Sequence, residues 1–563
     1  MGGSTTTSRD NSTVTMSSSA HSPSSWLKVQ WISRDQPCHA HSPTEPPSKS
    51  IASLTKELDD LKHKFMPAAA SCADAINDYY ERNGSDEKTT ASFEFRRARS
   101  ICNLYESLGA ASCHRYSSRK KRYIRQNDNS ISSGVDQFVN RSALKLANID
   151  ALMGFGLVHP VSSHSHRNVC RGSTRDDDVQ DKYFAFVDLC GAPGGFSEYI
   201  LYRRQHPVKS VRDYTVKLAK EDSNGCGSKK DSSFRHVDTK NKVVDIDNNH
   251  FQNIHSSANE VNQLPCYGFG MSLIGSNEDG KGASWDLSHL ERYHNRDHKC
   301  KKKRKVKCAN EKKSSPNKFC HDFLHYKVCN GSDGTGNIYN WDNIMYFRRE
   351  VISTLQKTNL HNEKITGLVH LVVADGGFDA QRDSSSQEEV AHRIIVSQTV
   401  TALSLLRPGG NFVIKMFGFQ LKRTRAIVQY LYGHFEKIGL IKPIVSRPAS
   451  AERYLVCLGF DGSDDSWDGL FWRDHMMNAD VPPNKIIHSV MDTCDRWSGL
   501  NDVLHLFDIQ MLQLNIDSCH SIVQYLLEKK VDVAKGELPI TDKYSEGKNI
   551  DMKFYEQSWY LAC

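Results

Sequence analysis

The stretch that decides the fold of this chain is Tyr183-Phe-Ala-Phe-Val-Asp-Leu-Cys-Gly-Ala-Pro-Gly-Gly-Phe196. Its first half is mainly apolar and predicts a buried strand over 183–189, and its second half is a turn of glycine and proline. The residues over 196–204 predict a helix. Glycines let a ligand approach the backbone closely, and the first turn of a helix offers unpaired amide groups. The stretch therefore predicts an α/β sheet with a cofactor site at this turn.

The spacing of the glycines excludes two familiar cofactor turns. Glycines separated by one and then two residues, as in a dinucleotide-binding turn, do not occur here. No Lys-Ser or Lys-Thr pair follows them, as a Walker loop requires. A simple tight turn without a ligand is the alternative interpretation. The strand, the acidic Asp188 and the helix all accompany the glycines, which favours a nucleoside-containing cofactor of another kind.

Strands and helices alternate on both sides of this turn. Upstream, the residues over 138–150 predict an amphipathic helix. Downstream, the sequence predicts strands over 266–273, 368–375, 411–417, 440–445 and 453–460, and helices over 341–356, 386–406 and 421–437. This alternation is typical of an α/β fold, a Rossmann-like sheet with helices on both faces.

Composition divides the chain into four expected regions. They are a disordered Ser/Thr-rich tail over 1–50, a helical and basic extension over 51–137, the α/β domain over 138–460 and a helical annex over 461–563. Within the α/β domain, polar insertions with the composition of disorder are expected at about 162–181, 207–263 and 285–330. The longest two far exceed normal connections between sheet elements, so they are interpreted as appended segments.

Overall composition argues against a membrane-spanning or secreted protein. Only 38% of the 563 residues are hydrophobic, and no apolar run is long enough to span a bilayer. The 16 cysteines are scattered without a paired framework, which is typical of a reducing compartment. The net charge of +7 is modest, but basic residues cluster between Lys301 and Lys307. This clustering suits a polyanionic partner, although a solvated run of charges is the commoner explanation. A soluble intracellular protein is expected.

Four polar residues occupy positions where chemistry is favoured. Asp375 ends one predicted strand, and Lys415 lies near the end of the next. Glu452 begins the last strand, and Lys145 lies on the helix over 138–150. A lysine in so apolar a strand is unusual, because burying an ammonium without partners is costly. Taken singly, Asp375 could cap a turn, and Lys145 and Glu452 could be surface charges, so the interpretation depends on the set.

At this point the sequence resembles the FtsJ/RrmJ-like ribose 2′-O-methyltransferases. Within that family it is most similar to the eukaryotic branch that methylates the first transcribed nucleotide of capped mRNA. The resemblance covers about 96–460, less the insertions, and its blocks occur in the family's order. They are Asn140-Arg-Ser-Ala-Leu-Lys145, Asp188-Leu-Cys-Gly-Ala-Pro-Gly-Gly-Phe196 with Ser-Glu-Tyr after it, Gly268-Phe-Gly-Met271, Ala374-Asp-Gly-Gly-Phe378 and Ser446-Arg-Pro-Ala-Ser-Ala-Glu-Arg-Tyr454.

The resemblance implies that Lys145, Asp375, Lys415 and Glu452 form a catalytic tetrad and that the methyl donor is S-adenosyl-L-methionine. Lys415 would activate the ribose hydroxyl. Lys145 and Glu452 would adjust the basicity of Lys415 and hold the ribose. Asp375 would orient Lys415 and the methyl donor. A hydroxyl is a poor nucleophile, so a group that takes its proton is needed. Lysine can serve if its pKa, about 10.4 when unperturbed, is lowered. Burial and a second ammonium lower that pKa, whereas carboxylates raise it.

The resemblance also implies the contacts to cofactor and RNA. Those to the cofactor would come from Asn140, Asp188, Cys190, Gly191, Ala192, Pro193, Gly194, Gly195, Phe196, Asn337, Ile338 and Asp375. Asn337 replaces an acidic residue that the family's pattern would place near the adenine, although an amide oxygen can still accept from an amine. Arg99 and Glu452 would contact the RNA. A guanidinium suits phosphate because it donates two parallel hydrogen bonds, although Arg99 could equally be a surface residue of a helix.

Three further expectations concern location, partners and metal. The run Lys301-Lys-Lys-Arg-Lys-Val306 predicts a nuclear localisation signal, with non-specific phosphate binding as the rival interpretation. Capped mRNA or pre-mRNA is the expected partner, and the transcription machinery is a candidate partner. No metal is expected, because His298, Cys300, Cys308, Cys320, His321 and Cys329 contain no Cys-x-x-Cys pair.

Two alternatives remain open from the sequence. One is the same chemistry on ribosomal, transfer or small nuclear RNA. The other, of a different class, is a catalytically inactive protein that binds the cap or RNA. The presence of all four tetrad residues favours an enzyme over the second alternative.

Overall fold

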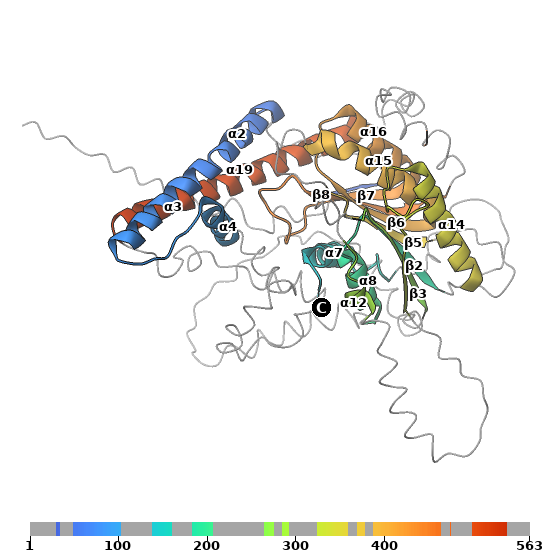
Figure 1. Ribbon diagram of the computed structural model, residues 1–563. Coiled ribbons are helices and arrows are strands. Elements are labelled where there is room, and N and C mark those ends of the chain that lie inside the picture. The colour runs from blue at the N-terminus through green and yellow to red at the C-terminus, as the bar shows by residue number, and fades with distance from the viewer. Residues whose placement is uncertain are drawn as a thin grey trace, which may run out of the picture.

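The computed structural model describes residues 30–33, 49–102, 138–159, 183–205, 264–274, 284–291, 324–358, 369–377, 387–462, 473 and 498–536. These residues form an α/β sheet covered by helices on both faces, with a group of long helices beside one end of it (Figure 1). No helix among them is long and apolar enough to cross a membrane.

The sheet has eight strands in the order β1-β7-β8-β6-β5-β2-β3-β4. Its strands are β1 (Gln30–Ser33), β2 (Phe184–Leu189), β3 (Cys266–Met271), β4 (Leu324–Val328), β5 (Val369–Ala374), β6 (Leu406–Met416), β7 (Phe435–Ile441) and β8 (Arg453–Phe460). Strands β4, β3, β2, β5 and β6 are parallel, whereas β8 runs antiparallel to β6 and β7. The chain goes from β2 outward to β4 and returns to β5 on the other side of β2. Ligands of open α/β sheets bind at the carboxyl ends of the strands beside such a reversal.

Two hydrophobic cores sandwich the sheet. One core contains residues of α14 (Trp341–Thr358), α15 (Gln387–Leu405) and α16 (Lys422–His434), and the other contains residues of α7 (Arg141–Leu152), α8 (Gly195–Gln205) and α12 (Leu287–Glu291). The central strands β2 and β5 are buried along their whole length, as expected for strands covered by helices on both faces. The expected fold class, with helices on both faces, is thereby confirmed.

The helices of the two ends of the chain form one unit. It consists of α2 (Ile51–His63), α3 (Phe65–Arg82), α4 (Ala91–Cys102) and α19 (Ser498–Ala534), which we call the helical unit. Its apolar residues form two small cores, both of which also contact Ala449 in the segment before β8. Within it, Lys529 of α19 donates to Glu94 of α4 over 2.6 Å, and both side chains are buried. The sequence predicted helices at both ends, but not that they pack together.

Several sequence expectations are corrected at the edges of the sheet. Strand β1 lies within the tail that was expected to be disordered, where it pairs with β7. Helix α12 and strand β4 lie within the insertion expected at about 285–330, and β7 begins at Phe435 rather than near residue 440. Edge strands this short contain too few residues for an alternating pattern to emerge from polar surroundings. The remaining parts of the three expected insertions lie outside the described residues, as does most of the tail.

Candidate active site

The four predicted tetrad residues meet at one rim of the sheet. Asp375 directly follows β5, and Lys415 lies on the neighbouring β6, whose Ile414 is in register with Ala374. Glu452 directly precedes β8, which is antiparallel to β6, so the start of β8 reaches the rim where β6 ends. Lys145 is on α7, which packs over this end of the sheet from the face that also carries α8. Three sheet elements and one helix therefore converge, as predicted.

The tetrad consists of two lysine–carboxylate pairs. Nζ of Lys415 lies 3.0 Å from Oδ1 of Asp375 and donates over 2.8 Å to the main-chain oxygen of the same residue. Nζ of Lys145 donates to Oε2 of Glu452 over 2.7 Å. Side-chain exposure is only 9% for Lys415 and 11% for Asp375, so water screens this pair weakly. The pairing orients both ammonium groups with few alternative positions.

Three residues that the sequence analysis did not single out complete the network. The hydroxyl of Ser142 donates to Oδ2 of Asp375 over 2.7 Å, and that of Tyr454 donates to Oδ1 over 2.8 Å. The hydroxyl of Ser446 donates to Oε1 of Glu452 over 2.7 Å. A signal was available, because Ser142 lies one helical turn before Lys145, and Ser446 and Tyr454 lie in the same block as Glu452. Each carboxylate is thus saturated with donors, which fixes its orientation.

The electrostatics correct the expectation that the pKa of Lys415 is lowered. Burial opposes the ammonium form, but the carboxylates of Asp375 and Glu452 outweigh burial and raise the pKa of Lys415. Burial alone would raise the pKa of both carboxyl groups, but Lys415 and Lys145 lower the pKa of Asp375, and Lys145, Lys415 and Lys442 lower that of Glu452. At neutral pH both carboxylates and the Lys415 ammonium are therefore charged.

The predicted cofactor turn follows β2 with a strained, closely packed backbone. Cys190 has a φ of 57°, in the left-handed region that non-glycine residues seldom adopt, and Gly194 has a φ of 110°. Asp188 is fully buried beneath the turn, where its Oδ2 accepts from the main-chain N–H of Ser197 over 3.1 Å and from its hydroxyl over 2.7 Å. A Cβ at position 191 would lie 2.0 Å from Oδ1 of Asp188, so only glycine fits there. Asp188 therefore stabilises the turn through these hydrogen bonds and close contacts on its buried side.

The helix that carries Lys145 is fixed against the same turn. Oδ1 of Asn140 caps α7 by accepting from Ser142 N–H over 2.9 Å. A Cβ at position 195 would lie 2.1 Å from that oxygen, so a glycine is needed for α7 and α8 to approach this closely. Phe196 is buried and packs near Tyr454, with ring centroids 6.2 Å apart. The glycine turn consequently packs directly against the helix that carries Lys145 and beside Tyr454, which contacts Asp375.

These features were compared with known proteins. The family described as FtsJ-like methyltransferase matches residues 138–262 and 306–460. The chain belongs to the FtsJ-like methyltransferase family.

Three similar relatives carry the name cap-specific mRNA (nucleoside-2′-O-)-methyltransferase 1. The protein from Danio rerio is 26% identical over 402 residues, that from Homo sapiens 28% over 359, and that from Drosophila melanogaster 24% over 466. These matches cover 71%, 62% and 83% of this chain, but 32%, 30% and 40% of the relatives. The chain thus spans about a third of the length of these relatives.

A putative ribosomal RNA methyltransferase from Plasmodium falciparum is a structural neighbour. It is 14% identical, with a TM-score of 0.26, and the match covers 57% of this chain and 99% of that one. The fold described above rests on the strand order and not on this similarity.

The FtsJ-like site fits a nucleoside-containing cofactor by observations of its own residues. Oδ1 of Asp188 is buried and accepts no hydrogen bond from the described residues. The glycines after β5 are closely packed, and a Cβ at position 376 would lie 2.1 Å from Nε2 of Gln398. A Cβ at position 377 would lie 3.0 Å from Nζ of Lys415. Glycine at position 377 thus leaves Nζ of Lys415 uncovered by a side chain of that residue.

The segment predicted to contact the adenine lies beside the next strand. A Cβ at position 336 would lie 1.9 Å from the main-chain oxygen of Ser272, directly after β3, so the segment packs against the carboxyl end of that strand. Oδ1 of Asn337 accepts from Tyr339 N–H over 3.0 Å, whereas the side chain of Ile338 is buried in the core. Asn337 therefore organises its own loop, and its contact to the adenine stays a prediction.

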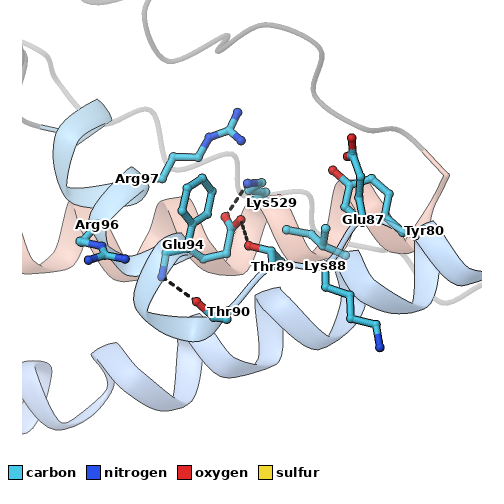
Figure 2. Close-up of a pocket in the computed structure, with 11 residues that line it drawn as sticks. Tyr80, Glu87, Lys88, Thr89, Thr90, Glu94, Arg96, Arg97 and Lys529 are labelled. Atoms are coloured by element: carbon cyan, nitrogen blue, oxygen red, sulfur yellow. Dashed lines mark hydrogen bonds and ion pairs between the residues drawn. The ribbon is translucent and has the colours of Figure 1, made fainter. Parts of the chain in front are cut away.

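Arg99 lies on α4 of the helical unit, and its guanidinium is 5.9 Å from the ring centroid of Phe95. A pocket lies between α3, α4 and α19, and its lining includes Arg96 and Arg97, which are close to Arg99 in sequence (Figure 2). No tetrad residue lines this pocket. Lys88, Arg96 and Arg97 give this lining an excess of basic groups. The structure places Arg99 beside basic residues, but no described contact links it to the tetrad.

Some sequence predictions fall where the structure gives no description. The basic run over 301–307, Phe378 and five of the six residues considered for zinc lie outside the described residues. Only Cys329 of those six is described, and it is buried. Within the described ranges, no group of His, Cys, Asp and Glu side chains is arranged to hold a metal ion.

Proposed function

We propose that this protein transfers a methyl group from S-adenosyl-L-methionine to the ribose 2′-hydroxyl of the first transcribed nucleotide of capped mRNA. The observation that carries the proposal is the pairing of Lys415 with Asp375, and of Lys145 with Glu452, beside the glycine turn after β2. Family membership supports methyl transfer, and the names of the relatives support the capped RNA substrate.

The residues around the turn would hold the cofactor. Cys190 to Phe196 and Asn140 would surround its methionine part, Asn337 would face its adenine, and Asp375 would orient it at the reacting end. The cofactor supplies an electrophilic methyl group when bound. The residues of this chain then have to align the ribose oxygen with that group and remove a proton.

The geometry assigns different tasks to the two pairs. Lys415, held by Oδ1 and the main-chain oxygen of Asp375, would contact the 2′-hydroxyl and take its proton as the bond from that oxygen to the methyl carbon forms and the bond from the methyl carbon to the sulfur of the cofactor breaks. Lys145 and Glu452 would hold the ribose, since a fixed orientation is worth several orders of magnitude in rate. Only the neutral amine can accept a proton, so the raised pKa of Lys415 makes the active form a minor one at neutral pH.

Capped RNA is recognised, in this proposal, with help from the helical unit. Arg99 and the basic residues of α4 would contact the phosphates at the 5′ end, because guanidinium groups bind phosphate through paired hydrogen bonds. Helix α4 is tied to α19, and α19 contacts the segment that carries Glu452. Through that connection, RNA bound by the helical unit would lie in a fixed position relative to Glu452 at the catalytic rim.

The experiment compares methyl transfer to one RNA sequence with a 5′ cap and with a 5′ triphosphate. Radiolabelled cofactor measures the rate, and digestion to nucleotides followed by mass spectrometry identifies the methylated position. The proposal predicts a 2′-O-methyl group on the first transcribed nucleotide and much slower reaction without the cap. Equal rates on both RNAs would instead favour ribosomal, transfer or small nuclear RNA as substrate. RNA binding without turnover would favour an inactive binding protein.

A nuclear location is part of the proposal. The basic run over 301–307 supports it, since lysine-rich segments of this length act as nuclear localisation signals. Pre-mRNA, and through it the transcription machinery, would then be the environment of the protein. Replacing the four residues Lys301, Lys302, Lys303 and Arg304 by alanine should shift a fluorescently tagged protein out of the nucleus. Unchanged nuclear accumulation would contradict this role.

A further inference from the structure

Lys442 is a buried lysine next to the tetrad to which the proposed mechanism gives no task. It follows β7 directly and is 1% exposed. Its Nζ donates to the main-chain oxygens of Ser450 and Glu452, each over 2.6 Å. These two carbonyls lie on either side of Ala451, in the turn that leads into β8. Lys442 therefore holds the backbone of the residue whose side chain pairs with Lys145.

A lysine is costly to bury at this position. Burial lowers the pKa of Lys442 to about 7, even though the carboxylate of Glu452 acts in the opposite direction. Arg453 and Lys145 also face the ammonium and lower its pKa further. A methionine of similar volume would avoid the cost of burying an ammonium, but it would leave the carbonyls of Ser450 and Glu452 without the hydrogen bonds that Lys442 donates.

The two hydrogen bonds act on a segment that is otherwise held mainly at its side chains. Ser446 fixes Oε1 of Glu452, Lys145 fixes Oε2, and the hydroxyl of Ser450 accepts from Glu452 N–H over 3.2 Å. Lys442 anchors the carbonyls of Ser450 and Glu452 to the end of β7, while Arg453 donates to the carbonyl of Ala451 between them over 3.0 Å. Without that anchor, the carboxylate could still be ionised but would lose its fixed distance to the rim.

We propose that Lys442 is a positioning residue for the methyl-transfer site, which acts by fixing the Ser450–Glu452 turn and thereby the Lys145–Glu452 pair. This inference rests on the proposed function, because its effect is defined at Glu452. It predicts that Lys442→Met remains folded and binds the cofactor normally, but is impaired in the catalytic step.

The experiment measures kcat, KM for RNA, cofactor Kd by calorimetry and melting temperature for Lys442→Met. Lys437→Met is the matched control, because Lys437 is an exposed lysine of β7, the strand that Lys442 follows. A misplacement of about 1 Å in a catalytic group costs about 100-fold in rate. We therefore expect kcat of Lys442→Met to fall about 10- to 100-fold with a cofactor Kd close to that of the wild type, and the melting temperature to fall by only a few degrees, because two carbonyls lose their donor. The control should retain wild-type values throughout.

The decisive comparison adds the same substitution to Glu452→Gln. If Lys442 acts through Glu452, Lys442→Met should lower the residual kcat of Glu452→Gln by less than about threefold, because coupled residues are not additive. A full 10- to 100-fold further loss would overturn the proposal, as would unchanged kcat in the single variant or loss of folding by Lys442→Met. Activity of the wild type is measured first. If the wild type showed no methyl transfer, the proposed function would be refuted. The cofactor Kd and melting temperature of each variant would then still show whether it binds the cofactor and folds.

Discussion

Two buried lysine–carboxylate pairs in this molecule look alike in isolation but differ in what surrounds them. The site pair, Lys415 and Asp375, has an Nζ–Oδ1 distance of 3.0 Å, and the helix pair, Lys529 and Glu94, has an Nζ–Oε2 distance of 2.6 Å. Exposure of the side chains is 9% and 11% in the site pair and 4% and 2% in the helix pair. Burial and pairing alone would not identify the catalytic one.

The two pairs differ in the neighbours of each carboxylate and in the elements that each pair joins. In the site pair the lysine lies beside Gly377, and its partner carboxylate also accepts from two hydroxyl donors. In the helix pair the carboxylate also accepts from Thr89 over 2.9 Å and links α4 to α19 (Figure 2). The site pair therefore belongs to the network at the sheet rim that the proposed reaction uses, whereas the helix pair joins two helices and lines the pocket between them.

The largest effect is expected for Lys415→Met. Loss of the group that takes the proton should lower kcat for methyl transfer by about 1000-fold, within the range of general acid–base catalysis. Ser142 and Tyr454 continue to satisfy Asp375, so the protein should remain folded. Initial rates and circular dichroism measure the two quantities, and Lys422→Met on the surface of α16 is the control. More than 10% of wild-type kcat in Lys415→Met would exclude Lys415 as the base.

Lys529→Met should give the opposite result. Removing one partner of a buried pair leaves Glu94 as an uncompensated charge, which costs about 3–5 kcal/mol of unfolding free energy. Denaturant unfolding measures the loss, and the exposed neighbour Lys530 provides the control variant Lys530→Met. The kcat of the protein that remains folded should change less than twofold. A stable Lys529→Met variant without activity would contradict the division between the two pairs.

A third buried pair connects the two regions and should show an intermediate behaviour. Asp508 of α19 forms an ion pair with Arg453, the residue after Glu452, and its Oδ2 accepts from Phe419 N–H over 3.0 Å. Asp508→Asn weakens a charged hydrogen bond and should lower the unfolding free energy by about 2 kcal/mol. It should also lower kcat several-fold, since it loosens the start of β8. Asp502→Asn, on the exposed side of α19, should do neither.

The pH dependence should separate the chemistry of the site pair from its stability. Because the pKa of Lys415 is raised, the neutral amine increases about tenfold per pH unit below that pKa, and kcat should rise accordingly between pH 7 and about 8. The stability contributed by the same shift is fully present in this range and is lost only as pH rises through the raised pKa. Rates at several pH values, each with a melting curve, test both statements. A kcat that is flat over this range would indicate that proton removal by Lys415 does not limit the rate.

The sequence allowed the sheet and the tetrad to be predicted because both depend on residues at strand ends. Asp375 and Lys415 follow strongly apolar stretches, so their positions at one rim could be deduced from the parallel order of the strands. The antiparallel start of β8 at Glu452 needed the family resemblance. Strands β1 and β4 are short edge strands whose pairing partners are distant in sequence, and no local pattern marks them.

The surroundings of the site were less predictable for a different reason. Lys442 donates to main-chain oxygens, which leave no trace in the sequence, and Ser142 and Tyr454 are ordinary residues until the strands and α7 are placed. The helical unit joins residues 94 and 529 across 435 positions of chain, a contact that periodicity cannot predict. The direction of the pKa shift of Lys415 also required distances, because burial and carboxylates act against each other.

The most direct test is the nucleotide composition of capped RNA after incubation with S-adenosyl-L-methionine and equal amounts of folded wild type, Lys415→Met and Lys529→Met. Mass spectrometry of the digested RNA measures 2′-O-methylation of the first transcribed nucleotide. We predict the methylated nucleotide with the wild type and with Lys529→Met, and almost none with Lys415→Met. Equal methylation by Lys415→Met, or methylation at a base instead of the ribose, would contradict the assignment of the site.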